Sequence, residues 1–298
     1  MFSKRWARLM LRRQSIWVPL IFAVRKPVTS RVPKTNLVRQ VSFWGAASVL
    51  LSFFGFSVDF AVGLESSQNF IVLVSQEAPP DFAVRVLARA ETFRREIAEE
   101  WFGESLPPSV GRAILNVNLS ETDERGLTWA IDDSRRTLHT VYLTASIDEA
   151  LGSLLRHEIA HVVLATQYPF PHRLPAWLEE GIASRYDNDA RRKIREQVLR
   201  WMARSGNWAD LDRVLAASSI NAQDEVAYGI ASSLVEYLLA QGSKQQLLRF
   251  AAAGNTEGWD QAVHRAYRFV DVENLQNSWQ AWVSERHALA LAELPRPE

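Results

Sequence analysis

The chain of 298 residues contains no cysteine. Disulfide bonds, thiolate metal ligands and cysteine nucleophiles are therefore excluded. Histidine is scarce, with six in the whole chain, so two histidines at a meaningful spacing are informative. The chain also lacks internal repeats and low-complexity tracts. Its hydrophobic fraction of 47% and its eleven tryptophans are enough for the packed core of one or two domains.

Acidic residues are missing from the beginning of the chain. Ten basic residues and no acidic residue precede Asp59. The remainder carries 24 basic and all 34 acidic residues, a balance of −10, although the whole chain is formally neutral. The main part of the protein is thus mildly acidic, and we expect no nucleic-acid partner.

The basic segment leads into residues 40–58, nineteen consecutive residues without a charge. One interpretation is a signal peptide cleaved after Gly63, because Ala61 and Gly63 are the small residues that a cleavage site needs. Translation from Val38 would shorten its long leader. A second interpretation is membrane anchoring through an uncleaved segment, since nineteen residues nearly span a bilayer. A buried core helix is the third, and the flanking charges disfavour it.

The first two interpretations share a location. Because positively charged flanks stay in the cytoplasm, the rest of the chain would be exported, or membrane-anchored with the catalytic domain outside the cytoplasm. We therefore expect three parts: residues 1–63 as a basic leader with a signal peptide or anchor, residues 64–287 as the folded domain, and residues 288–298 as a flexible tail.

Hydrophobic periodicity within the folded domain places strands before helices. Strands are predicted at residues 69–75, 113–119, 126–131 and 137–144. One helix is expected from the Asp81 cap to about Phe102 and another from Ile147 onward. Later segments predict helices alone, at residues 176–186, 191–204, 224–239, 244–253, 257–267 and 272–286. The fold class is therefore α+β, with a mixed sheet followed by an all-helical part.

The most informative motif is His157-Glu158-Ile159-Ala160-His161. Residues four apart on a helix share a face, so both imidazoles can bind one ion. Glu180, nineteen residues after His161, can supply a third ligand from a following helix. Two histidines, one glutamate and an open position are typical of a catalytic zinc site, with one Zn²⁺ per chain. Glu158 lies where a carboxylate can act on water bound to that ion.

The alternative is an exposed helix that carries two histidines and a glutamate by chance. The residues on both sides of the motif are apolar at helical spacing, which predicts a largely buried helix. Buried histidine and glutamate side chains need partners, so burial favours the metal site.

Together, the motif and Glu180 resemble the gluzincin metallopeptidases. The resemblance is closest to the small bacterial peptidase MA-like proteins and covers roughly residues 69–283. It is carried by three further segments, Leu154-Leu155-Arg156, Leu174-Pro175-Ala176-Trp177 and Ala227-Tyr228-Gly229. It implies a zincin-like fold, with a mixed sheet and the active-site helix in an N-terminal lobe and helices alone in a C-terminal lobe. The lobes would meet near residues 167–174 with the metal between them.

The resemblance also implies roles for side chains. Glu158 would be the catalytic base, and Tyr228 would donate a hydrogen bond to the developing oxyanion, with Tyr186 and His264 as weaker candidates. Thermolysin-type enzymes carry an aspartate four residues after the ligand glutamate, as acceptor for a ligating histidine. Ser184 stands there, so the acceptor is unidentified. Glu179 is expected to face solvent, and His172 lies in a proline-rich loop.

The function implied is zinc-dependent hydrolysis of a peptide or protein substrate. Residues 126–131 or 137–144 would form the edge strand that binds an extended peptide. The chain lacks the Gly-x-Met-Glu-Asn element of the aminopeptidase branch, which favours an endopeptidase. Two alternatives stay open. One is a catalytically inactive zincin-fold binding or scaffold protein at the cell envelope, disfavoured because Glu158 is intact. The other is a zinc hydrolase of non-peptide amides.

Overall fold

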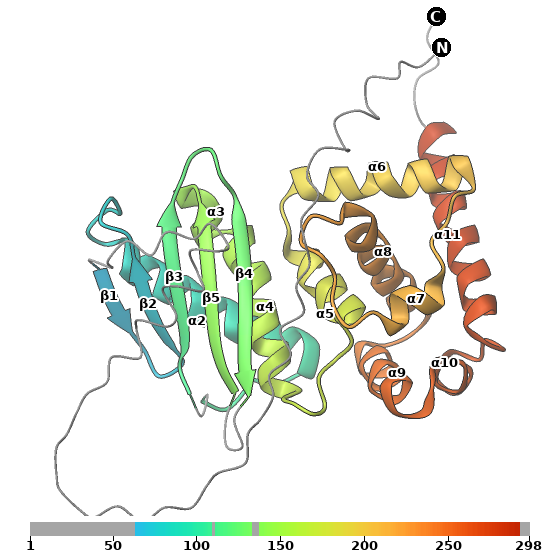
Figure 1. Cartoon of the computed structure of the whole chain (residues 1–298), viewed down its shortest axis with the longest axis horizontal. Coiled ribbons are helices and arrows are strands. Elements are labelled where there is room, and N and C mark those ends of the chain that lie inside the picture. Colours follow the sequence, from blue (N-terminus) through green and yellow to red (C-terminus); the bar gives the residue numbers. More distant parts are fainter. Residues whose placement is uncertain (1–62, 109–110, 133–136, 293–298) are drawn as a thin grey trace, which may run out of the picture. The chain divides into compact units, whose positions relative to one another are not determined.

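A computed structural model describes residues 63–108, 111–132 and 137–292 (Figure 1). The expected leader, cleavage site and uncharged run of residues 1–62 lie outside these ranges, as do residues 293–298. Within the ranges, no helix combines the length and apolar character needed to cross a membrane.

The strands form one mixed five-stranded sheet in the order β1-β2-β3-β5-β4. Its central strands are parallel, and β1 and β4 are antiparallel edges. The bounds are β1 Gly63–Ser66, β2 Phe70–Val74, β3 Ala113–Leu119, β4 Arg125–Asp132 and β5 Thr137–Ala145. The expected α+β class and mixed sheet are confirmed. β1 was not anticipated, because it is short and its residues lack a clear apolar alternation.

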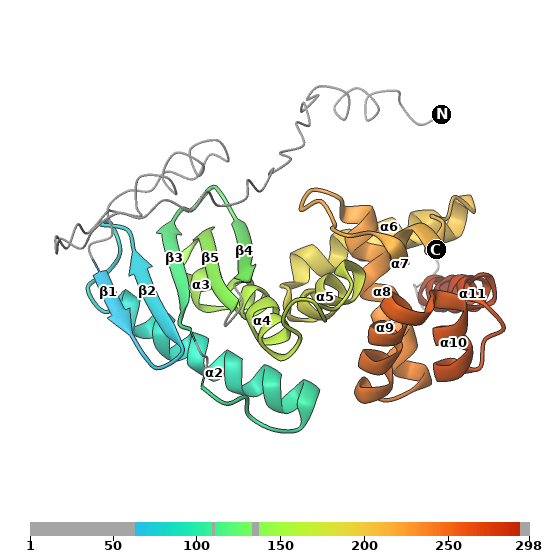
Figure 2. The same cartoon turned by 60° about the horizontal axis from the view of Figure 1, so that its bottom comes forward.

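Helices α2, α3 and α4 lie along one face of this sheet (Figures 1 and 2). Alternate strand residues such as Phe70, Val72 and Leu115 point into that layer and are fully buried. Helix α2, Phe82–Phe102, buries a stripe that ends with Trp101. It stops at Gly103, whose φ of 80° gives a left-handed C-cap.

The helix expected from Ile147 is two helices, α3 Ile147–Leu151 and α4 Ser153–Gln167. Gly152 separates them with φ −117° and ψ −129°, far from helical values. A Cβ at this position would lie 2.6 Å from the carbonyl oxygen of Asp148. The break lets α4 start in a direction of its own, and this helix carries both motif histidines.

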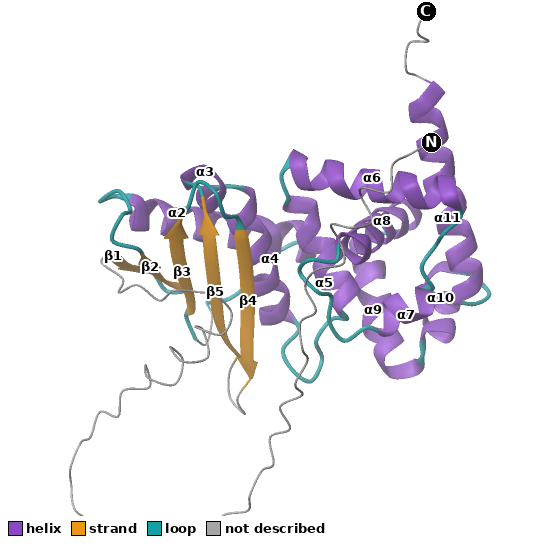
Figure 3. Ribbon diagram, turned by 45° about the horizontal axis from the view of Figure 1, so that its top comes forward, coloured by secondary structure: helices purple, strands orange, loops and turns teal. Residues whose placement is uncertain are grey.

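The part of the chain after α4 that the structure describes forms helices and loops (Figure 3). The expected helices are present, and the short helix α7 was not anticipated. The elements are α5 Ala176–Ala183, the 3₁₀ turn η1 Ser184–Tyr186, α6 Asp189–Ser205, α7 Leu211–Ala216, α8 Glu225–Gln241, α9 Lys244–Glu257, α10 Trp259–Tyr267 and α11 Val272–Ala292.

The segment expected as a flexible tail, residues 288–298, begins inside a helix. Helix α11 continues to Ala292. Alanine and leucine alternate from Ala288 to Ala292, and both have high helix propensity, so the helix persists. Pro295 and Pro297 are the first residues that disfavour a helix.

Helices α5 and α8 cross closely at Gly181, the residue after Glu180. A Cβ on Gly181 would lie 2.6 Å from both the Ala231 carbonyl oxygen and Val235 Cγ2. The carbonyl is backbone and cannot rotate away. Only glycine therefore allows α5 to approach α8 at this distance, and this approach brings Glu180 near the residues at the start of α8.

We expect Gly181→Ala to lower the free energy of unfolding by about 1–3 kcal/mol, because the methyl group forces the helices apart. Urea denaturation followed by circular dichroism measures the change. Gly229→Ala is a matched control on α8, since its Cβ would meet no atom closer than 3.7 Å. Equal stability of Gly181→Ala and wild type would contradict the tight crossing.

Candidate metal centre

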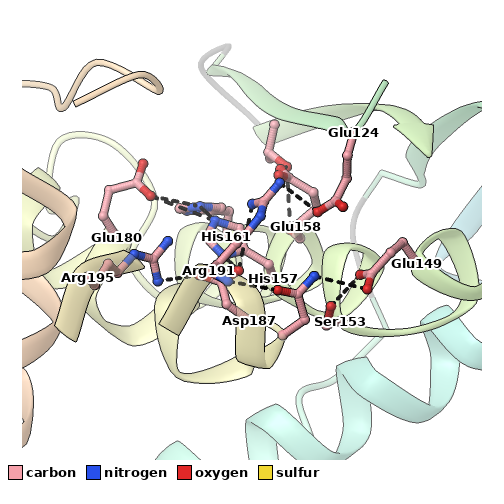
Figure 4. Close-up of polar contacts among 12 residues, drawn as sticks. Glu124, Glu149, Ser153, His157, Glu158, His161, Glu180, Asp187, Arg191 and Arg195 are labelled. Carbon is pink, nitrogen blue, oxygen red and sulfur yellow. Dashed lines mark hydrogen bonds and ion pairs between the residues drawn. The ribbon is translucent and has the colours of Figure 1, made fainter. Parts of the chain in front are cut away.

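Helix α4 carries His157, Glu158 and His161 beneath the sheet. His157 and Glu158 are each 4% exposed, and His161 is half-buried. The two Nε2 atoms of the histidines are 3.3 Å apart. Glu180 reaches them from α5, with its Oε2 3.8 Å from His157 Nε2 and 3.6 Å from His161 Nε2 (Figure 4). The three residues predicted from spacing alone are thus brought together.

The donor set fits a divalent cation. Zinc bonds of about 2.1 Å at tetrahedral angles place ligand atoms about 3.4 Å apart, close to the three distances observed. Glu180 Oε2 is buried and has no hydrogen-bond partner. A buried carboxylate oxygen without a partner is costly, and a cation at this point would satisfy it. Among the described residues, no other group of three potential ligands meets in this way.

Electrostatics within the trio favour a positive charge. Burial lowers the pKa of His161, but the adjacent Glu180 carboxylate raises it to about 10. Burial likewise raises the pKa of Glu180, yet His161, His157 and the Tyr228 hydroxyl hold it below its usual value. The carboxylate stays ionised and stabilises a cation beside it.

Asp187 is the acceptor that the sequence left unidentified. Its Oδ1 lies 2.9 Å from His157 Nδ1, and its Oδ2 accepts a hydrogen bond from Arg195 (Figure 4). Burial raises the pKa of Asp187, but His157 and Arg195 lower it to about 2. An ionised Asp187 keeps the proton of His157 on Nδ1 and leaves the Nε2 lone pair facing Glu180 and His161.

Strand β4 holds Glu158 from above. Thr128 Oγ1 donates a 2.5 Å hydrogen bond to Glu158 Oε2. Gly126, two residues earlier on the same face, lies against the other oxygen, where a Cβ would be 2.1 Å from Oε1. Sequence reasoning missed both residues. Their signal is the Gly-x-Thr alternation on a strand next to the motif helix.

Tyr228, at the first turns of α8, reaches the same centre. Its hydroxyl lies near the Glu180 carboxylate, and the Arg195 guanidinium lies 5.1 Å from its ring centroid. Burial, and then the negative charge of Glu180, raises the pKa of Tyr228 well above its usual range. The hydroxyl therefore stays protonated and can donate a hydrogen bond.

The weaker candidates do not reach the centre. Tyr186 accepts from Trp101 Nε1 at 2.9 Å and donates to Glu100 at 2.8 Å. His264 is exposed on α10 and contacts the Phe269 carbonyl. His172 is exposed in the loop before α5.

Glu179 was expected to face solvent, and the structure differs. It does not face solvent freely: its Oε1 is buried without a hydrogen-bond partner, and burial raises the pKa of its carboxyl group. The α5 helix packs closely enough against its surroundings to cover this residue as well as Glu180.

The two candidate edge strands are not equivalent. β4 is the edge strand and lies beside α4. β5 pairs with β3 on one side and β4 on the other, so residues 137–144 cannot offer a free edge. The interpretation of that segment as a peptide-binding edge was wrong, because chain order does not reveal that β4 is the outer strand.

We expect Asp187→Asn to weaken zinc binding by about 10–100-fold, because the amide no longer fixes the tautomer and orientation of His157. Competition with a chromophoric chelator measures the affinity. Asp189→Asn is a suitable control, since Asp189 is 79% exposed and pairs with Arg192 on the surface. An unchanged affinity in Asp187→Asn would argue against this positioning role.

Comparisons with known proteins assign no family. No protein-family model matches this chain, and no curated protein matches it. The observations that bear on function are the convergence of His157, His161 and Glu180 and the position of Glu158 beside them.

Proposed function

We propose that this chain is a zinc-dependent peptidase with a zincin-like fold of the gluzincin type. The observation that carries the proposal is the meeting of His157 Nε2, His161 Nε2 and Glu180 Oε2 within 4.8 Å of one another. Their donor chemistry suits zinc, and three protein ligands leave a position for water or substrate. The ligands come from both sides of residues 167–174, as expected for a metal held between two lobes.

When bound to these ligands, zinc lowers the pKa of a coordinated water towards neutrality and polarises the substrate carbonyl. Glu158 accepts the proton as the water attacks and passes it to the leaving amine. Thr128 donates to one oxygen of this carboxylate, and the missing side chain of Gly126 leaves room for the other. The base is thus held in one orientation before substrate arrives.

Tyr228 stabilises the oxyanion that develops on the substrate carbonyl. Its pKa is raised, so it keeps the proton that the oxyanion needs. In the structure the hydroxyl lies near the Glu180 carboxylate. During the reaction the hydroxyl turns from the carboxylate to the substrate oxygen, where negative charge is accumulating.

The substrate is an extended peptide or an unstructured protein segment. Among the described strands, β4 pairs with β5 alone and is the outer strand on that side of the sheet, and its Gly126 and Thr128 contact the catalytic base. A peptide that adds to this edge as a further strand passes beside the metal centre. The missing Gly-x-Met-Glu-Asn element favours cleavage within a chain over removal of its first residue.

The proposed location is outside the cytoplasm. The support is in the sequence: ten basic residues precede Asp59, and residues 40–58 form a nineteen-residue uncharged run. This arrangement suits a signal peptide or an anchor with a cytoplasmic basic flank.

The direct test is Glu158→Gln. We expect wild-type protein to bind one zinc per chain and to cleave an unstructured protein such as casein. The variant should keep its zinc and lose activity by at least about 100-fold, because the amide cannot accept a proton. Glu104→Gln, at an exposed position, is the control. Zinc-loaded wild type that cleaves nothing would support the binding or scaffold alternative.

Gly126→Ala tests how the base is held. The added methyl group would lie 2.1 Å from Glu158 Oε1, so the carboxylate must move. We expect kcat/KM to fall by about 10–100-fold, as for other small displacements of a catalytic group, with zinc content unchanged. Leu127→Ala, on the opposite face of the strand, should have a smaller effect. Equal kcat/KM for Gly126→Ala and wild type would refute this contact.

A further inference from the structure

A polar cavity of about 210 Å³ lies among η1, α6 and α8. Its wall includes Ser184 and Arg185 from η1, and Arg192, Arg195 and Glu196 from α6; Glu236 comes from α8. None of the three candidate metal ligands lines it, and neither does Glu158. The cavity is therefore distinct from the metal centre.

Several buried donors around this cavity have no partner. Ser184 is 1% exposed and its Oγ makes no hydrogen bond. Arg195 is 5% exposed, and its Nε makes no hydrogen bond, although it lies 3.9 Å from Glu225 Oε2 in an ion pair. Arg185 Nε is likewise buried and unsatisfied. Unpartnered buried donors are rare, and three around one cavity indicate a missing acceptor.

The carboxylates in the cavity wall already have cationic partners. Both wall carboxylates are already paired, because Arg286 lies 2.6 Å from Glu236 and 3.5 Å from Glu196. Arg192 is paired with Asp189 at 2.6 Å. Among the described residues, Arg185 forms no direct ion pair, and its buried Nε makes no hydrogen bond. The Glu100 carboxylate interacts with its charge without bonding to the guanidinium group.

We propose that this cavity binds a small tetrahedral oxyanion of the size of inorganic phosphate. Guanidinium groups bind phosphate oxygens through short charge-assisted hydrogen bonds, and a serine hydroxyl can add another. A water occupies about 30 Å³, so the cavity holds the five heavy atoms of phosphate with room for water. Arg185, Arg195 and Ser184 provide the donors.

Arg195 connects this anion site with the metal centre. One of its guanidinium nitrogens bonds to Asp187, which in turn contacts His157, and Arg195 also lines the cavity. The anion therefore holds Arg195 in the orientation that supports Asp187, without touching a metal ligand. The site does not depend on the proposed peptidase activity.

The test is phosphate binding to the full chain, measured by titration calorimetry and by thermal unfolding. Phosphate can also coordinate metal ions, so the protein is first treated with a chelator. We expect a dissociation constant of about 1 mM or lower. At ten times this concentration, the unfolding temperature should rise by about 3–6 °C, with no rise in chloride of equal ionic strength.

Two substitutions at one position identify the site. Arg185→Gln should weaken phosphate binding at least 10-fold, and Arg185→Lys, which keeps the charge but loses the planar group, should weaken it less. Arg213→Gln, at a residue that is 88% exposed on α7, should bind like wild type. The proposal is overturned if wild type shows no phosphate-specific stabilisation, or if both Arg185 variants bind phosphate as tightly as wild type.

Discussion

The buried carboxylate of Asp187 is the contact on which the centre depends. It lies between the His157 imidazole of α4 and the Arg195 guanidinium of α6, and so joins the helix beneath the sheet to the helical part. A carboxylate buried this deeply is stable only with such partners. The same contact fixes the imidazole tautomer, orients Arg195 beside the Tyr228 ring, and sets one wall of the polar cavity.

Two glycines allow the elements around the metal centre to approach one another closely. Gly126 lets β4 lie directly over Glu158, and Gly181 lets α5 lie directly against α8. In each case the space that a side chain would occupy is filled by a group from another element. The positions of Glu158 and Glu180 are therefore set by close backbone contacts. Such contacts vary less than contacts between long side chains.

Much of the fold and of the metal centre could be predicted from the sequence. The residues that could not be placed have physical reasons in common. The metal trio follows from helical spacing and a well-marked second helix, so His157, His161 and Glu180 converge as expected. Asp187 could not be placed, because it follows a 3₁₀ turn whose geometry has no periodic signature. Gly126 and Thr128 gain their roles only when strand order is known. The break at Gly152 and the burial of Glu179 likewise depend on tertiary packing.

The division of the three ligands between α4 and α5 has a consequence for biosynthesis. During translation, His157 and His161 are synthesised before Glu180, and Tyr228 is synthesised later still. A partly made chain thus lacks a complete cation-binding set and the hydroxyl group opposite it. If the chain is the proposed peptidase, hydrolytic competence would arise only after the residues on both sides of 167–174 have been translated and have folded together.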